Sequence, residues 1–188
     1  MKEEEATLKK ALNFALYAIA ILYLFIMLDL LFRFNIISSA NAAARSYNLI
    51  PFKTIWKYMT GAYNVSFEML MINVPGNIAV FIPFGTYLQV FLKNKTFLKS
   101  LLILILTVIA VEGLQFAFAV GACDVDDLIL NVFGGVIGIF SYRLLRRLKK
   151  EDEKAKIAVA IISIIVGLPI ICTYFYIFIS MFFNRRMG

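Results

Sequence analysis

Five apolar runs, each long enough to cross a lipid bilayer, constrain the fold of this chain more than any other feature. A helix needs about 20 apolar residues to cross the hydrocarbon core, at a rise of 1.5 Å per residue. Of the 188 residues, 62% are hydrophobic and 16% are charged, which excludes an ordinary soluble domain. The sequence therefore predicts an all-α integral membrane protein, a compact bundle of about five transmembrane helices in a single domain over residues 1–188. The predicted spans cover residues 11–32, 67–92, 97–120, 126–145 and 157–183.

The second predicted span contains two prolines and two glycines, Pro75, Gly76, Pro83 and Gly85. Because proline removes a helical hydrogen bond, this span is predicted to be kinked or broken. A broken helix inside a membrane is tolerated only where neighbouring groups or a water-lined cavity satisfy the freed backbone. A kink that serves packing alone explains the same residues. Gly167 and Pro169 predict a further kink in the last span.

The net charge of +7 comes from lysines and arginines that lie in short clusters between the apolar runs. Such clusters set topology and meet anionic headgroups, so membrane lipids and not nucleic acid are the expected partners. With the N-terminus inside, 13 of the 19 basic residues fall on the cytoplasmic side. The positive-inside rule therefore predicts a multi-pass protein with a cytoplasmic N-terminus and an extracytoplasmic C-terminus.

The chain has no histidine and only two cysteines, Cys123 and Cys172, which lie in different segments. The missing histidine excludes Ser-His and Cys-His nucleophile schemes and histidine metal sites. The cysteine spacing indicates neither a disulfide nor a metal framework. No resident cofactor is therefore expected, apart from a divalent cation if the acidic residues bind one.

Acidic and amide side chains collect around the stretch from Val120 to Gly138. Ionisable residues inside membrane spans indicate a functional site. In the predicted orientation, Glu112 and Asn131 lie on either side of an outer turn, each about 8–13 Å below the surface. Side chains from three helices are thus predicted to meet in the outer half of the bilayer. The predicted ligand-binding residues are Asn77, Glu112, Gln115, Asp124, Asp127 and Asn131.

A carboxylate at this depth costs several kcal/mol unless it is protonated, paired or hydrated. Interhelical hydrogen bonds, worth about 0.6 kcal/mol each, would explain one or two such groups. A pocket that opens toward the outer leaflet explains all six better. The nearby glycines Gly134 and Gly138 form a GxxxG pair that permits close helix approach, within the bundle or between copies, so the oligomeric state stays open.

Three segments, NVPGNIAVFIPFGTYL at 73–88, EGLQ at 112–115 and DVDDLILNVFGGVIG at 124–138, occur in a specific order. With the weaker NLIPFKTI at 48–55, this combination resembles the VanZ-like membrane protein family over about residues 45–142. The resemblance implies a bacterial cell-membrane protein. The founding family member is associated with resistance to teicoplanin, a lipid-tailed glycopeptide that acts at the outer face of the membrane. The family often has an arginine where this chain has Gly121, so the charge pair with Asp124 that the resemblance implies is either missing here or supplied by Arg45 or Arg33.

Three functions are compatible with these residues. The first is a membrane factor that lowers susceptibility to lipoglycopeptides by binding an amphiphile, either the antibiotic or a lipid-linked cell-wall precursor, in the outer-leaflet pocket. The alternative is a membrane enzyme acting on a lipid-linked cell-wall substrate, with Glu112 or Asp127 as the catalytic group. In that enzyme, Asp124, Asp126 and Asp127 would bind a divalent cation, because oxygen ligands favour Mg²⁺, Mn²⁺ or Ca²⁺.

The third function, an ion or proton pathway, would require polar residues that continue toward the cytoplasm. After Asn131, the fourth span offers none before Ser141. The sequence therefore gives this pathway the least support.

Overall fold

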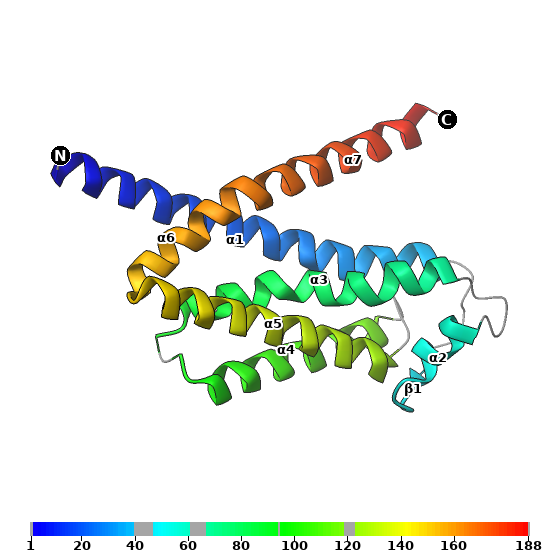
Figure 1. Ribbon diagram of the computed structural model, residues 1–188. Coiled ribbons are helices and arrows are strands. Elements are labelled where there is room, and N and C mark those ends of the chain that lie inside the picture. Colours follow the sequence, from blue (N-terminus) through cyan, green and yellow to red (C-terminus); the bar gives the residue numbers. More distant parts are fainter. Residues whose placement is uncertain (1, 40–46, 61–66, 94, 119–122, 188) are drawn as a thin grey trace. The chain divides into compact units, whose positions relative to one another are not determined.

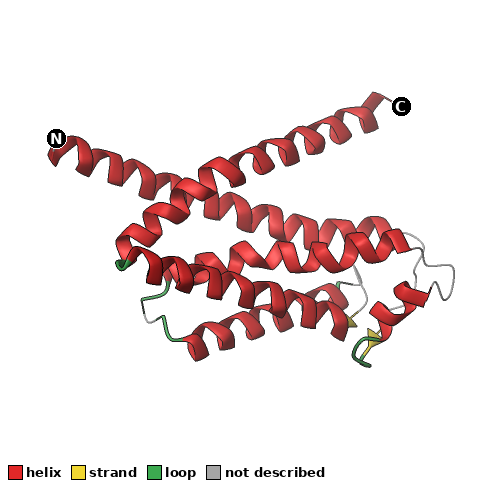
Figure 2. Ribbon diagram, in the orientation of Figure 1, coloured by secondary structure: helices red, strands yellow, loops and turns green. Residues whose placement is uncertain are grey.

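The computed structural model describes residues 2–39, 47–60, 67–93, 95–118 and 123–187. Nearly all of these residues are helical (Figure 2), which confirms the all-α prediction. The elements are α1 (Lys2–Ser39), β1 (Tyr47–Asn48), α2 (Lys53–Thr60), α3 (Phe67–Phe91), α4 (Phe97–Ala117), β2 (Cys123–Asp124), α5 (Val125–Lys149), α6 (Asp152–Ile162), a π-helical turn (Ser163–Gly167) and α7 (Leu168–Met187).

Five helical segments in the described residues are long and apolar enough to cross a membrane, as predicted. They agree with the apolar runs of the sequence to within a few residues at most ends. The first begins well before residue 11. The spans are Glu3–Phe32, Leu70–Phe91, Phe97–Ala117, Val125–Lys149 and Asp152–Ser180.

The prolines of the second and fifth spans have different structural outcomes. Helix α3 runs without interruption from Phe67 to Phe91 with Pro75 and Pro83 inside it, so the helix is not broken and a kink stays a prediction. In the fifth span, a π-helical turn between α6 and α7 ends at Gly167, two residues before Pro169. Because Pro169 has no N–H to donate to the preceding turn, a local change of hydrogen-bond register there is physically reasonable.

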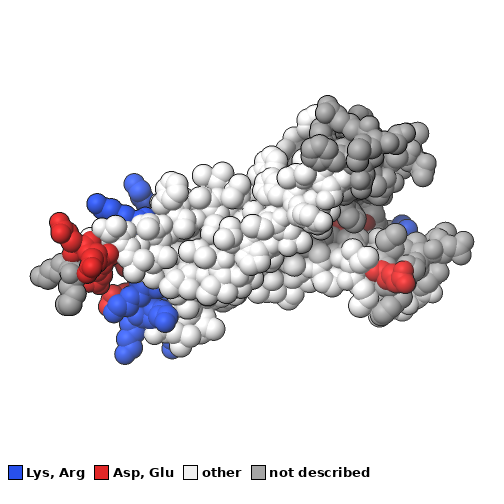
Figure 3. All heavy atoms as spheres, turned by 90° about the horizontal axis from the view of Figure 1, so that it is seen from above, with Lys and Arg blue, Asp and Glu red and all other residues white. Residues whose placement is uncertain are grey.

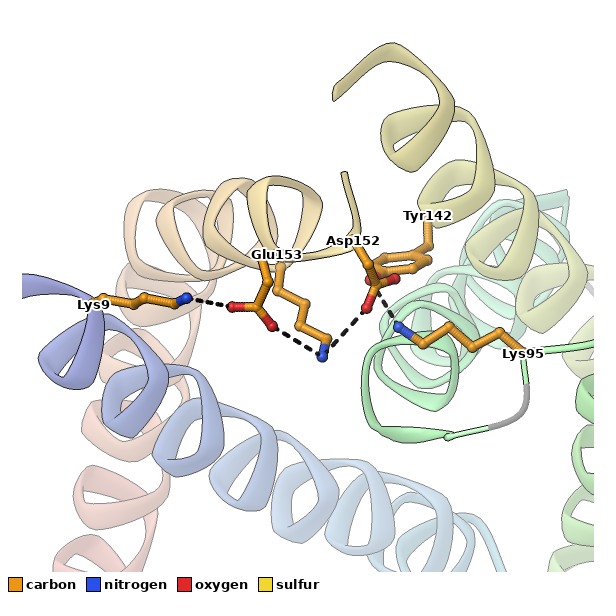
Figure 4. Close-up of polar contacts among 6 residues, drawn as sticks. Lys9, Lys95, Tyr142, Asp152 and Glu153 are labelled. Atoms are coloured by element: carbon orange, nitrogen blue, oxygen red, sulfur yellow. Dashed lines mark hydrogen bonds and ion pairs between the residues drawn. The ribbon is translucent and has the colours of Figure 1, made fainter. Parts of the chain in front are cut away.

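The chain forms two compact units, residues 1–28 with 145–188 and residues 29–144. In the first unit, Ile19 and Ile26 of α1 pack with Ile171 of α7 in a buried cluster. Lys9 of α1 forms an ion pair with Glu153 of α6, with 2.8 Å between Nζ and Oε2 (Figure 4). Apolar packing and one exposed ion pair thus connect α1 with α6 and α7 in this unit.

In the second unit, α3, α4 and α5 lie side by side (Figure 1). The backbones of α3 and α5 approach so closely that only glycine fits between them. A Cβ atom on Gly85 would lie 1.9 Å from the carbonyl oxygen of Gly135, and one on Gly138 would lie 2.0 Å from that of Ile82. The GxxxG pair of the sequence therefore packs within the chain, against α3.

Large apolar side chains are exposed along the spans, among them Phe14, Ile21, Leu102 and Leu106. On the face drawn in Figure 3, uncharged side chains cover a broad area. Soluble proteins rarely expose many large apolar side chains side by side, whereas helices in lipid do so without cost. The exposed surface therefore agrees with a protein embedded in a membrane.

Candidate functional site

Asp124 holds the start of α5 and ties two other elements to it. It directly precedes α5, and its Oδ1 accepts a hydrogen bond from the backbone N–H of Asp126 at 2.9 Å, as a helix N-cap does. The same carboxylate accepts a hydrogen bond from Asn48 Nδ2 at 3.0 Å and one from Thr54 Oγ1 at 2.5 Å. Asn48 lies on β1, which pairs in parallel with β2, so Asp124 fixes β1 and α2 against the end of α5.

Asp126 binds the N-terminus of α2. Its carboxylate accepts hydrogen bonds from the backbone N–H groups of Phe52, Thr54 and Ile55, the last two at 2.8 and 3.1 Å. The first N–H groups of a helix have no intrahelical partner, and the helix dipole favours a negative charge at this end. Both oxygens of Asp126 are therefore engaged by the main chain, and the side chain is only 1% exposed.

Asp127 points to a different partner, a chain of amides on α3. Its Oδ1 accepts a hydrogen bond from Asn77 Nδ2 at 2.7 Å, and the same nitrogen donates to Asn73 Oδ1 at 2.7 Å. Asn73 in turn donates to the hydroxyl of Tyr58 on α2 at 3.1 Å. The structure thus brings together Asn77 and Asp127, two of the predicted ligand-binding residues.

Glu112 of α4 and Asn131 of α5 form the most deeply buried polar pair at this end of the helices. They are 5% and 1% exposed, and Asn131 Nδ2 donates to Glu112 Oε1 at 3.3 Å. The other oxygens, Glu112 Oε2 and Asn131 Oδ1, are buried and have no hydrogen-bond partner in the described part of the chain. Leaving a buried acceptor unpaired costs about 1–3 kcal/mol. Two such oxygens on one hydrogen-bonded pair therefore require a physical explanation.

The carboxylates act on one another electrostatically. Asn131, the hydrogen-bond partner of Glu112, lies four residues after Asp127 on α5, so the two hydrogen-bonded groups share one face of that helix. Burial raises the pKa of the nearby Cys123 thiol, and the charges of Glu112 and Asp124 raise it further. Within the described ranges, no lysine or arginine forms an ion pair with these carboxylates. Arg45, Gly121 and the side chain of Arg33 lie outside what the structure describes.

Gln115, also predicted as a ligand-binding residue, has a packing contact. Its Nε2 donates to the backbone carbonyl of Leu31 at 2.8 Å, which ties α4 to the part of α1 in the second unit. Gln115 is 5% exposed. Its role in ligand binding stays a prediction, as do those of the other five predicted residues.

The sequence analysis missed Asn48, Thr54 and Tyr58 as members of this polar network. The signal that could have found the first two is the segment NLIPFKTI, in which they are the uncharged polar residues and Lys53 is the remaining polar one. Tyr58 follows on the same short helix, four residues after Thr54, where side chains share a face.

A second polar group lies at the opposite ends of α3 and α5. Gln89 Nε2 donates to Ser100 Oγ, and both side chains are fully buried. Lys95 Nζ donates to the Tyr142 hydroxyl at 3.3 Å (Figure 4), and Arg143 Nη2 donates to the Lys95 carbonyl at 2.6 Å. Basic groups thus gather at this end of the second unit, whereas the carboxylates gather at the other.

The comparisons with known proteins give one family and one relative. A family model described as VanZ/LLP1 matches residues 14–146, a range that includes every predicted site residue. Protein VanZ of Enterococcus faecium is 33% identical over 156 residues, which are 82% of this chain and 87% of that protein. No solved structure matches.

Proposed function

Because the chain belongs to the VanZ/LLP1 family of multi-pass membrane proteins, we propose that it lowers the susceptibility of a bacterial cell to teicoplanin and related lipoglycopeptides. It does so by binding an amphiphile at the polar site built on Glu112 and Asn131. The amphiphile is either the antibiotic itself or a lipid-linked cell-wall precursor. The protein lies in the cell membrane with its N-terminus in the cytoplasm and its C-terminus outside.

The observation that carries this proposal is the pair of unpartnered oxygens, Glu112 Oε2 and Asn131 Oδ1. Groups that served only as interhelical contacts would be expected to satisfy one another. Acceptors left without a donor in the protein alone are instead suited to a ligand that supplies the donors. An intramembrane carboxylate with this environment is by default a functional group.

The depth of the pair agrees with binding from the outer leaflet. Glu112 lies six residues before Phe118, which follows the end of α4, and Asn131 lies six residues after the start of α5. Six residues correspond to about 9 Å of helix. In the orientation favoured by 13 of the 19 basic residues, these helix ends face the outside, where lipid-tailed antibiotics and cell-wall lipids are met.

The enzymatic alternative draws on the same Glu112 oxygen, which is free to act as a general acid or base within the described residues. Its divalent cation would need oxygen atoms of Asp124, Asp126 and Asp127. Protein donors already engage both oxygens of Asp124 and of Asp126, so we rank this alternative second. Metal-dependent turnover of a lipid-linked cell-wall substrate by the purified protein would reverse that ranking.

The experiment that tests the proposal measures drug susceptibility of a sensitive Gram-positive host. The host expresses the natural chain, Glu112→Gln or Asp127→Asn, and Glu68→Gln serves as the control because Glu68 is an exposed carboxylate on α3. We expect the natural chain and Glu68→Gln to raise the minimum inhibitory concentration of teicoplanin more than that of vancomycin. We expect the two site variants to lose this protection while inserting in the membrane normally.

Two outcomes would contradict the proposal. One is a natural chain that reaches the membrane and gives no protection. The other is full protection by both Glu112→Gln and Asp127→Asn, since the polar site would then be irrelevant to resistance.

A further inference from the structure

We infer that the amphiphile presents a primary ammonium group, –NH₃⁺, to the Glu112–Asn131 pair. The inference rests on the proposed function in one respect, namely that this pair binds an amphiphile. It adds the chemical class of the headgroup, which neither the family nor the relative specifies.

The first argument is the excess of acceptors. When Glu112 is ionised, its Oε2 and Asn131 Oδ1 are both acceptors, both buried and both without a donor in the described part of the chain. They belong to side chains that are already hydrogen-bonded to each other, so they lie at one place. A bound group that completes the pair has to donate hydrogen bonds.

The second argument is the charge of the surroundings. Asp127 lies four residues before Asn131 on α5, the helix that supplies one half of the pair, and no lysine or arginine of the described residues is ion-paired with Glu112 or Asp127. A phosphate or another anion would add like charge and further acceptors, both of which are unfavourable in a medium of low dielectric constant. The site therefore selects a cation or a neutral donor, and its carboxylates favour the cation.

The third argument separates the possible cations. A divalent metal needs several carboxylate oxygens that face one point, but both oxygens of Asp124 and of Asp126 already accept hydrogen bonds from protein donors around α2. Among the residues described, no group of three or more acidic, cysteine or histidine side chains is arranged to hold a metal ion. A quaternary ammonium has no N–H and is typically bound by aromatic rings instead.

A primary ammonium has three N–H donors and matches the acceptors that remain. Two of them fit Glu112 Oε2 and Asn131 Oδ1. The third fits the carboxylate of Asp127, which is four residues from Asn131 on α5 and so lies on the same face of that helix. A primary amine occurs in aminophospholipid headgroups and in amino groups of glycopeptides, and the test below separates these sources.

The test compares three probes that share a dodecyl chain, using the full-length protein in detergent micelles at neutral pH. They are dodecylamine, dodecyltrimethylammonium and dodecyl phosphate, and binding is measured by native mass spectrometry and by the shift of thermal unfolding. We expect dodecylamine to bind at least about tenfold more tightly than dodecyltrimethylammonium. The primary ammonium donates charged hydrogen bonds to the pair, and the quaternary ammonium has no N–H to donate. We expect dodecyl phosphate to bind more weakly than dodecylamine.

Matched variants locate the binding. Glu112→Gln and Asp127→Asn keep side-chain shape and should remove the preference for dodecylamine, whereas Glu68→Gln should keep it. Equal binding of the two cations, or tighter binding of dodecyl phosphate, would overturn the inference. So would a preference that survives both site variants, because the amine would then bind elsewhere. A variant that does not fold is recognised by the loss of its thermal unfolding transition. In that case, the comparison of the three probes on the natural chain decides whether the inference holds.

Two further arms identify the source of the amine. One compares the thermal unfolding of the protein in nanodiscs of phosphatidylethanolamine with that in nanodiscs of phosphatidylcholine. The other compares the binding of teicoplanin with the binding of its N-acetylated form. Discrimination in either arm supports the inference and names the source, whereas discrimination in neither overturns it. If the protein selects the amine but gives no drug protection, this inference stands and the proposed function fails. If the protein gives drug protection without selecting the amine, the proposed function stands and this inference fails.

Discussion

At the residue scale, three neighbouring aspartates serve three different purposes. Asp124 caps α5, Asp126 binds the N-terminus of α2, and Asp127 binds the amide of Asn77. Hydrogen bonds to a charged group contribute about 1.5–3 kcal/mol each. Asp126 also accepts a hydrogen bond from the N–H of Phe52. The backbone φ of Phe52 is 63°, a value that residues other than glycine rarely adopt. This carboxylate therefore stabilises a strained turn that positions α2.

Replacing Asp126 with asparagine tests this structural role. Asp126→Asn removes the charge and one acceptor oxygen, so at least one of the three backbone N–H groups is left without a partner. We expect the free energy of unfolding to fall by about 1–3 kcal/mol, and the amides of Phe52, Thr54 and Ile55 to exchange hydrogen faster. Hydrogen exchange read by mass spectrometry over residues 47–60 measures the second effect. Glu68→Gln is the control, and unchanged exchange in Asp126→Asn would show that α2 is held by other contacts.

At the element scale, the contact between α3 and α5 depends on the absence of side chains. Gly85 faces Gly135, and Gly134 faces Ile78. A Cβ atom on Gly134 would lie 2.1 Å from the carbonyl oxygen of Ile78. Without a hydrophobic force between helices in lipid, such close backbone approach supplies much of the packing energy. This contact also fixes Asn77 on α3 relative to Asp127 on α5, so it positions the polar site.

Gly85→Ala should therefore be costly even though alanine is the better helix former. Its Cβ would fall 1.9 Å from the Gly135 oxygen, so the helices must separate. We expect a loss of about 1–3 kcal/mol or more in the unfolding free energy, measured by thermal unfolding in detergent. Gly113→Ala on α4 is the matched control, because a Cβ there meets no atom within 4 Å. It should leave stability unchanged or raise it by up to about 1 kcal/mol. Equal stability of the two variants would contradict the close contact.

At the scale of the whole molecule, the odd number of candidate spans predicts that the two termini lie on opposite sides of the membrane. The excess of basic residues in the segments on the N-terminal side predicts which side is which. The location of Glu112 in the outer half of the bilayer depends on the same orientation.

Cysteine labelling measures this orientation. In a chain with Cys123→Ser and Cys172→Ser, a single new cysteine is introduced as Glu4→Cys or as Gly188→Cys. In intact cells, a membrane-impermeant maleimide should label Gly188→Cys, and it should label Glu4→Cys only after permeabilisation. The reverse pattern would put Glu112 in the inner half of the bilayer and remove the argument for binding from outside.

The sequence by itself determined the class of the fold and the family. Partition between water and lipid is a property of each segment, so the apolar runs predicted the five spans correctly. The motifs at 73–88, 112–115 and 124–138 predicted the family that the comparisons found. The glycines Gly134 and Gly138 predicted a close helix contact, because backbone approach requires small residues wherever it occurs.

The tertiary structure alone decided which groups meet. Nothing in the spacing of Asp124, Asp126 and Asp127 shows that the first and second bind protein donors around α2 while the third binds an amide of α3. Gln115 lies three residues from Glu112, yet its amide nitrogen binds the carbonyl of Leu31 on α1. The reason is physical. Burial in lipid depends on the composition of each segment. A hydrogen-bond partner depends on where two distant segments lie in space, which is decided only when the helices pack.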